Sequence, residues 1–212
     1  MLSKRVGAIQ CLLLVGVAAT LTGCAELRSA LLNDTGPGEQ TVAAGLREAL
    51  RVGTQRAVGV TGKEDGFLAN QLIRIPLPKQ LDSLASGLRR IGFKKEVDSL
   101  EVAMNRAAER AAVEAEAVFV DAIVTMTLAD AYGILKGGET AATDYFRGRT
   151  SDALRTRFRP IITAKMKDVG LYELYGRIIA KYESLPLVPK VDLDLDSYVT
   201  EKALDGLFAV LA

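Results

Sequence analysis

Apolar side chains recur at steps of three and four residues along most of this chain, which is the spacing of one face of an α-helix. The clearest stripe lies between Lys95 and Met126. Its apolar positions are Val97, Leu100, Met104, Ala107, Ala111, Ala115, Val118 and Ala122. Alanine dominates the middle of the stripe, so a neighbouring helix can approach closely there. The pattern predicts one long, central, alanine-rich helix.

The same spacing predicts further helices on both sides of the central one. Gly, Pro and capping residues mark their ends, for example the capping-box pattern from Thr127 to Asp130 and the N-cap candidate Asp196. Only Val191 to Leu195 alternates enough to suggest a strand. The expected helices cover residues 39–58, 78–91, 95–126, 128–136, 140–169, 171–182 and 197–211. The prediction is an all-α single domain of about six to seven helices.

The N-terminus has the pattern of an export signal. Lys4 and Arg5 precede a mostly apolar run over residues 6–20, which is too short for the roughly 20 residues that span a bilayer. The next residues, Leu21-Thr-Gly-Cys24, resemble the lipobox of bacterial lipoproteins, in which the cysteine receives lipid. An ordinary signal peptide with an incidental Cys24 is the alternative. We therefore expect a signal peptide (1–23), a lipidated tether (24–38) and a helical domain (39–212). Ala25 after the cysteine favours the outer membrane.

Composition excludes several kinds of chemistry. Removing 23 of the 212 residues leaves 189, and losing Lys4 and Arg5 leaves 25 basic against 26 acidic side chains. This near-neutral charge gives no reason to expect nucleic acid as a partner. The chain has no histidine and its only cysteines are Cys11 and Cys24. Histidine-dependent catalysis, the usual zinc sites and a disulfide in the mature domain are therefore excluded. We predict no cofactor, no metal site and no enzymatic activity.

Glu101 is the main polar residue expected to face the core. On a helical projection it lies inside the apolar stripe, and Asn105 lies one turn further on at its edge. A carboxylate in a core must be paired or protonated, because burying an isolated charge is costly. Two interpretations remain open: a polar ligand pocket, or a structural ion pair with an arginine of a facing helix. Arg149 and Arg157 are the candidate partners.

Two charged segments offer other sites. Residues 147–167 carry seven basic side chains against the single acid Asp152, so this stretch either faces anionic lipid or glycan phosphates, or pairs with acids elsewhere. The acids Asp192, Asp194 and Asp196 are spaced like the start of a calcium-binding loop. Ser197 stands where that loop requires glycine, and its final glutamate is missing, so we expect no calcium site.

Several strings, in this order along the chain, resemble the uncharacterised Gram-negative lipoprotein family known as domain of unknown function 4197. They are Gly62–Phe67 (GKEDGF), Ile75–Pro78 (IPLP), Met104–Glu109 (MNRAAE), Gly137–Thr143 (GGETAAT), Ser184–Val188 (SLPLV) and Lys202–Phe208 (KALDGLF). The resemblance runs from about residue 44 to the C-terminus. It implies an all-helical periplasmic domain behind a lipid anchor, and no activity or catalytic residue. Relatives often continue with a charged tail, so the end at Ala212 leaves open a truncated last helix.

Three hypotheses for function remain. The preferred one is a non-enzymatic lipoprotein at the periplasmic face of the outer membrane, which binds or supports another envelope component, protein or lipid. The second is a carrier or sensor of a small apolar or anionic ligand, held between helices near Glu101. A carboxylate-based hydrolase is the third. The sequence does not indicate an oligomeric state.

Overall fold

The computed structural model describes residues 38–90, 92–168, 170–184 and 193–212. By its internal contacts the chain divides into two units, 1–42 and 43–212. The first unit is described only over residues 38–42, so the packing below concerns the second. The predicted signal peptide, Cys24, nearly all of the tether, and Asp192 lie outside the described residues.

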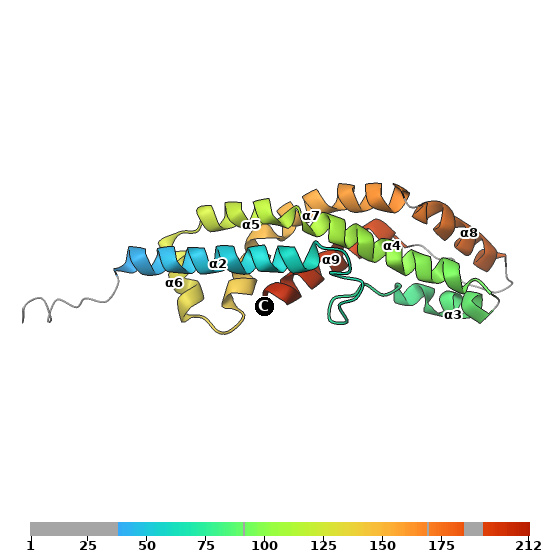
Figure 1. Cartoon of the computed structure of the whole chain (residues 1–212), viewed down its shortest axis with the longest axis horizontal. Coiled ribbons are helices and arrows are strands. Elements are labelled where there is room, and N and C mark those ends of the chain that lie inside the picture. The colour runs from blue at the N-terminus through green and yellow to red at the C-terminus, as the bar shows by residue number, and fades with distance from the viewer. Residues whose placement is uncertain (1–37, 91, 169, 185–192) are drawn as a thin grey trace, which may run out of the picture. The chain divides into compact units, whose positions relative to one another are not determined.

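The described residues form helices joined by loops and contain no strand, which confirms the all-α prediction (Figure 1). Residues 193–194, within the suggested strand, belong to no regular element, and Leu195 already begins a helix. The elements are α2 (Glu39–Thr61), the short 3-10 helix η1 (Lys79–Leu81), α3 (Asp82–Arg90), α4 (Lys94–Ala112), α5 (Ala115–Val124), α6 (Leu128–Lys136), α7 (Ala141–Asp168), α8 (Leu171–Glu183) and α9 (Leu195–Leu211).

Helix α4 is the centre of the packing. It contacts α3, α7, α8 and α9, and α7 also packs against α9 (Figure 1). The alanines of its apolar stripe are fully buried, so the neighbouring helices approach its backbone closely, as the sequence predicts. Beside them, the ring of Phe119 meets Phe146 edge-on at 5.2 Å between centroids and Phe208 at 6.2 Å. These ring contacts help to pack α5 against α7 and α9.

The prediction of one uninterrupted helix from 95 to 126 is wrong. The helix breaks at Val113 and Glu114, where the Glu114 N–H donates to the Ala111 carbonyl three residues back (3.0 Å). Both residues are exposed, and the buried stripe continues on either side of them. A tightened turn of this kind hardly disturbs the apolar spacing, so periodicity alone could not reveal it.

Two helix starts test the expected caps. Thr127 and Asp130 form the predicted capping box at the start of α6. The N-cap of α9 is Asp194, whose carboxylate accepts from the Ser197 N–H (3.0 Å), so the expectation of Asp196 is wrong. Asp196 lies inside the first turn, where it accepts from the hydroxyls of Tyr172 and Thr163. Either acid could cap the helix by its position in the sequence. Contacts with Thr163 of α7 and Tyr172 of α8 occupy Asp196, so Asp194 is the cap.

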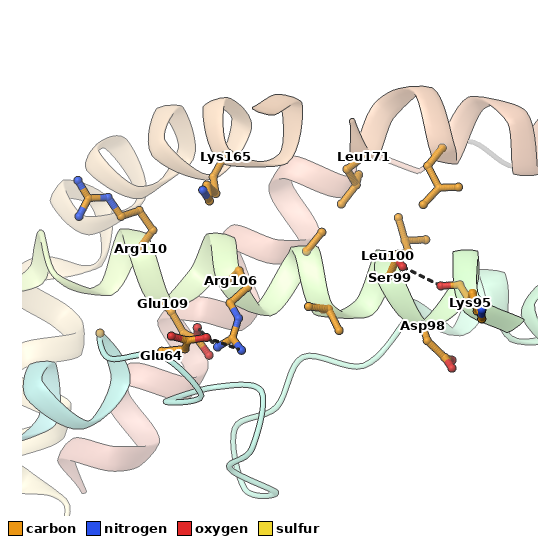
Figure 2. A pocket seen from close by; sticks show the side chains of 14 residues that line it. Glu64, Lys95, Asp98, Ser99, Leu100, Arg106, Glu109, Arg110, Lys165 and Leu171 are labelled. Atoms are coloured by element: carbon orange, nitrogen blue, oxygen red, sulfur yellow. Dashed lines mark hydrogen bonds and ion pairs between the residues drawn. The ribbon is translucent and has the colours of Figure 1, made fainter. Parts of the chain in front are cut away.

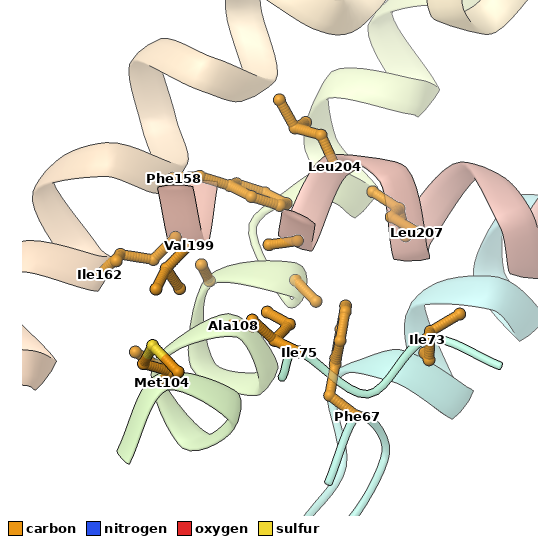
Figure 3. Packing of buried hydrophobic residues seen from close by; sticks show 14 of the residues in the cluster. Phe67, Ile73, Ile75, Met104, Ala108, Phe158, Ile162, Val199, Leu204 and Leu207 are labelled. Carbon is orange, nitrogen blue, oxygen red and sulfur yellow. The ribbon is translucent and has the colours of Figure 1, made fainter. Parts of the chain in front are cut away.

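The loop between α2 and η1 is part of the core. Its side chains Phe67, Ile73 and Ile75 are buried against Met104 and Ala108 of α4 and against residues of α7 and α9 (Figure 3). The ring of Phe67 lies so close to Gly206 of α9 that a Cβ there would come within 2.6 Å of it. A loop that carries so much buried surface must be held in one conformation.

Candidate functional site

The structure separates the four residues that the sequence analysis grouped as a candidate site. Glu101 pairs with Arg74 of the loop before η1, at 2.7 Å, and its side chain is 16% exposed. Arg149 and Arg157 form no ion pair with it, so the expected partners of Glu101 are wrong. The structural interpretation of Glu101, an arginine pair, is the one that the geometry supports. Its partner comes from a loop, where helical periodicity offers no guide to which residue will lie opposite.

Asn105 is fully buried and uses its side chain to hold the same loop. Its Oδ1 accepts from the Ile75 N–H (2.9 Å), and its Nδ2 donates to the Ile75 carbonyl (2.8 Å) and to the Glu101 carbonyl (2.8 Å). The polar atoms of the side chain are therefore occupied by backbone groups. The expected ligand pocket around Glu101 and Asn105 is not supported.

Glu109 is the buried carboxylate that the sequence analysis missed. Its Oε1 accepts from the backbone N–H groups of Phe67 and Leu68, both at 3.1 Å, and its Oε2 pairs with Arg106 at 2.7 Å. Glu109 stands four residues after Asn105 and eight after Glu101, so the three form one row on α4. Continuing that row by one helical turn would have identified it.

Arg149 and Arg157 lie two turns apart on α7, at a shallow hollow of about 330 Å³ between α7 and α5. Both side chains are exposed, and neither forms an ion pair among the residues that the structure describes. The other lining residues are Val118, Asp121, Ala122, Thr125, Thr150 and Ala153. The two arginines thus share a surface of their own, apart from Glu101 and Asn105.

Several other basic residues of the 147–167 stretch pair with acids. Arg155 contacts Glu201 of α9 at 2.6 Å, and the hydrogen bonds from Arg155 lower the pKa of the Glu201 carboxyl. Further pairs join Arg155 to Asp152, Arg159 to Asp194 and Arg147 to Asp205, and Arg147 also stacks on the ring of Phe208. Much of this positive charge therefore serves to hold α9 against α7.

A groove of about 960 Å³ runs along the exposed face of α4 and is here called the α4 groove (Figure 2). Its floor is α4, one bank is the loop after α2, and the other bank is formed by the end of α7 and the start of α8. The lining residues are Gly62, Glu64, Lys95, Asp98, Ser99, Leu100, Val102, Ala103, Arg106, Glu109, Arg110, Lys165, Leu171 and Leu174.

The two banks of the α4 groove differ in charge. On the loop bank, Arg106 is shared by Glu109 (2.7 Å), Asp65 (2.8 Å) and Glu64 (3.4 Å), and hydrogen bonding to Glu109 raises the pKa of the Arg106 guanidinium. On the other bank, Arg110 and Lys165 form no ion pair with any carboxylate in the described part of the chain. Three carboxylates thus share one guanidinium on one side, and two cations stand unpaired on the other.

The parts of the chain that the structure covers show no metal-binding cluster and no single helix suited to span a membrane. They hold no group of three or more carboxylate or cysteine side chains placed to bind a metal ion. No single helix there is long and apolar enough to cross a bilayer, although Lys94–Val124 with Leu128–Lys136, bent by 105°, passes on length and composition as a pair.

Comparison with known proteins assigns the chain to a family but does not indicate an activity. Neither curated proteins nor solved structures gave a match. One family model, described as a protein of unknown function (DUF4197), matches residues 36–212, which is most of the chain and includes α4, its row of polar residues and the α4 groove. The chain belongs to the DUF4197 family.

Proposed function

We propose that this protein is a lipid-anchored, non-enzymatic component of the bacterial envelope whose helical domain docks another envelope protein in the α4 groove. The lipobox pattern ending at Cys24 supports an anchor at the periplasmic face of the outer membrane. The protein then acts within reach of that membrane, and its partner is a protein that shares the same space.

The α4 groove is the observation that carries this proposal. The side chain of Val102 is 40% exposed on its floor, and the groove stretches from Lys95 to Arg110 along α4. At about 1.5 Å per residue this distance is about 22 Å. Accessible apolar side chains at the middle of this length (Val102 and Ala103, with Leu174 of α8), flanked by charged side chains on both banks, suit a surface that receives a protein segment.

The groove offers little for catalysis. A carboxylate acid or base needs a free or strongly perturbed titratable group near the substrate. Asp98 pairs with Arg89 at 3.1 Å, and Glu109 is occupied by two backbone N–H groups and Arg106. Glu64 shares Arg106 and is otherwise exposed to water. This arrangement favours a binding module over the carboxylate hydrolase that the sequence left open.

A carrier of a small apolar ligand is also less well supported. The apolar hollow next to Leu100 and Ile178 has a volume of about 10 Å³, which is room for about one water molecule. The alanines in the middle of α4 are fully buried by neighbouring helices. The alanine-rich middle of α4 therefore holds no apolar cavity of ligand size, and the hollow of about 280 Å³ next to Ile178 is lined by the charged side chains of Glu96 and Arg177 as well as by apolar ones.

Site-specific photocrosslinking in living cells tests the proposal. A photoreactive phenylalanine analogue replaces Val102 in the groove or, as a matched control, Val124, an exposed valine of α5 that does not line it. We expect a protein adduct from position 102 that is absent from position 124, and direct binding of the identified protein once purified. Equal adducts at both positions, or adducts at 102 with lipid alone, would contradict a protein-docking groove.

A further inference from the structure

We infer that the α4 groove receives an amphipathic helix of the partner, with acidic side chains along one edge of its apolar face and basic side chains along the other. This inference rests on the proposed function and specifies the chemistry of the segment that the groove binds. It follows from three features of the groove: its shape, its apolar floor and the opposite charge of its banks.

The groove has the length and shape to hold one helix. Its floor is a straight helix, α4, and its banks are the loop at Gly62 to Glu64 and the junction of α7 and α8 at Leu171 (Figure 2). A helix of about 15 residues matches the roughly 22 Å of floor, because each residue advances about 1.5 Å. An extended strand would find no sheet edge here, since the described residues contain no strand to pair with it.

The floor supplies the apolar contact. Val102 and Ala103 of the floor and Leu174 of the α8 bank are partly exposed in the groove, whereas Leu100 of α4 and Leu171 of α8 are almost fully buried. Small and aliphatic side chains in this arrangement accept the knobs of a helix whose apolar residues recur at three and four positions. Burial of these partly exposed carbons provides the driving force, and the banks provide orientation.

One bank is basic. Figure 2 shows Arg110 of α4 and Lys165 of α7 on the same side of the groove, on facing helices. Neither cation has an ion-pair partner in the described residues, and Lys95 at the far end of the floor has none either. Acidic side chains on the edge of a docked helix that faces α7 would lie next to Arg110 and Lys165 and pair with them.

The opposite bank is acidic. The side chains of Glu64 and Asp65 are 84% and 56% exposed, and with the buried Glu109 they depend on the single guanidinium of Arg106. Glu64 and Glu109 line the groove, whereas Asp65 and its neighbour Lys63 lie just outside the lining. Basic side chains on the second edge of the docked helix would meet this excess of carboxylate. Charge of opposite sign on the two banks therefore selects a helix with two different edges.

Two synthetic 18-residue peptides test this assignment. Both carry the same leucine and alanine face. The first has glutamate along one edge and lysine along the other, and the second has lysine along both. Each is labelled with fluorescein, and its binding to the full chain in lipid nanodiscs is measured by fluorescence anisotropy, with empty nanodiscs as the blank. We expect the mixed-edge peptide to bind wild type at least tenfold more tightly than the all-lysine peptide.

Charge reversal supplies the decisive comparison. In the double variant Arg110→Glu, Lys165→Glu the basic bank becomes acidic, so the preference should invert and the all-lysine peptide should bind more tightly. The control variant Arg56→Glu, Lys136→Glu makes the same change of net charge away from the groove and should bind like wild type. Equal affinity of the two peptides for wild type, or an unchanged preference in the double variant, would overturn the inference.

The two proposals can fail separately. A protein crosslinked at position 102 that, once purified, binds wild type and the Arg110→Glu, Lys165→Glu variant equally well would leave the docking groove standing and remove the helix with two charged edges. If position 102 captures no protein beyond the control at 124, the docking groove itself is rejected. Circular dichroism and the Tm of each variant show whether the fold is retained, since Arg110 is exposed and Lys165 is half-buried.

Discussion

The side chain of Asn105 pairs with both backbone polar groups of Ile75, accepting from its N–H at 2.9 Å and donating to its carbonyl at 2.8 Å. These two hydrogen bonds satisfy the backbone N–H and carbonyl of Ile75 as a neighbouring β-strand would. Both residues are fully buried, so neither backbone group of Ile75 could turn to water instead. A single amide on α4 thereby replaces a sheet partner and holds an irregular loop in the core.

Replacing Asn105 by alanine should destabilise the domain by about 2–4 kcal/mol. The substitution leaves the buried N–H and carbonyl of Ile75 without this hydrogen-bond partner, and each unsatisfied group costs about 1–3 kcal/mol. Urea unfolding measures the change. Asn70→Ala is the matched control, because the Asn70 side chain accepts only an exposed bond from the Leu72 N–H, and we expect a loss below about 1 kcal/mol. Equal losses for the two variants would contradict the role assigned to Asn105.

Glu109 should matter far more than Glu101, although both are carboxylates of the same row on α4. Glu109→Ala leaves the N–H groups of Phe67 and Leu68 without an acceptor, at a cost of about 2–4 kcal/mol. Glu109→Gln keeps one acceptor oxygen and should lose less. Glu101→Gln weakens a partly exposed ion pair and should cost at most about 1 kcal/mol.

Hydrogen exchange gives an independent measure for this pair of variants. The amides of Phe67 and Leu68 should exchange faster in Glu109→Ala than in wild type, and at the wild-type rate in Glu101→Gln. Similar protection of both amides in all variants would mean that another group holds the loop.

Gly206→Ala should destabilise the domain by about 1–3 kcal/mol, the usual cost of forcing extra volume into a packed core. A Cβ at this position would lie 2.6 Å from the Phe67 ring and 3.1 Å from the Ile73 Cβ. Gly148→Ala on α7 is the control, because its Cβ would meet nothing within 4 Å. Alanine favours a helix interior over glycine by about 1 kcal/mol, so the control should gain stability in thermal unfolding. A stabilised Gly206→Ala variant would show that the loop packs differently.

The cap at Asp194 should give the domain a specific acid sensitivity. Hydrogen bonds from the Ser197 N–H and hydroxyl, with a smaller contribution from Arg159, hold the pKa of the Asp194 carboxyl below its usual value of 3.8. A carboxyl whose pKa is lower in the folded state stabilises the fold above its unfolded pKa, and this stabilisation disappears as the pH falls through the folded value. Stability from Asp194 should therefore be present above about pH 4 and decline below it.

Asp194→Asn isolates this effect, because asparagine also caps helices well but does not titrate. We expect wild type to have the higher Tm at pH 7 and the difference to shrink steadily from pH 4 towards pH 2. Thermal unfolding followed by circular dichroism across this range provides the measurement. A difference in Tm that does not depend on pH would show that the charge of Asp194 contributes nothing.

Cys24→Ser should abolish lipidation, and Cys11→Ser should leave it intact. Both cysteines precede the helical domain, but only Cys24 ends the lipobox pattern, whereas Cys11 lies in the apolar run expected to be removed. Cells fed an alkyne-bearing palmitate analogue report the modification by in-gel fluorescence. Label retained in Cys24→Ser would contradict the proposed anchor.

Much of the helical layout could be predicted from local pattern. Burial of one helix face requires apolar residues at three- and four-residue steps, so the stripe of α4 and the positions of α3, α6, α7 and α8 can be read from the chain within a few residues. The capping box of Thr127 and Asp130 is likewise local, because its bonds join residues three apart. The break at Val113 left the apolar stripe in register and gave no such signal.

The sequence by itself determined an all-α domain, a carboxylate and an amide in the apolar stripe of α4, and the absence of histidine-based chemistry. Only the tertiary structure decided what those polar groups do. It paired Glu101 with Arg74, turned Asn105 towards Ile75, made Glu109 an acceptor for the loop, and exposed Arg110 and Lys165 along one groove. Helix formation depends on neighbours within one turn, whereas each of these roles depends on a residue from a distant part of the chain, which packing alone brings near.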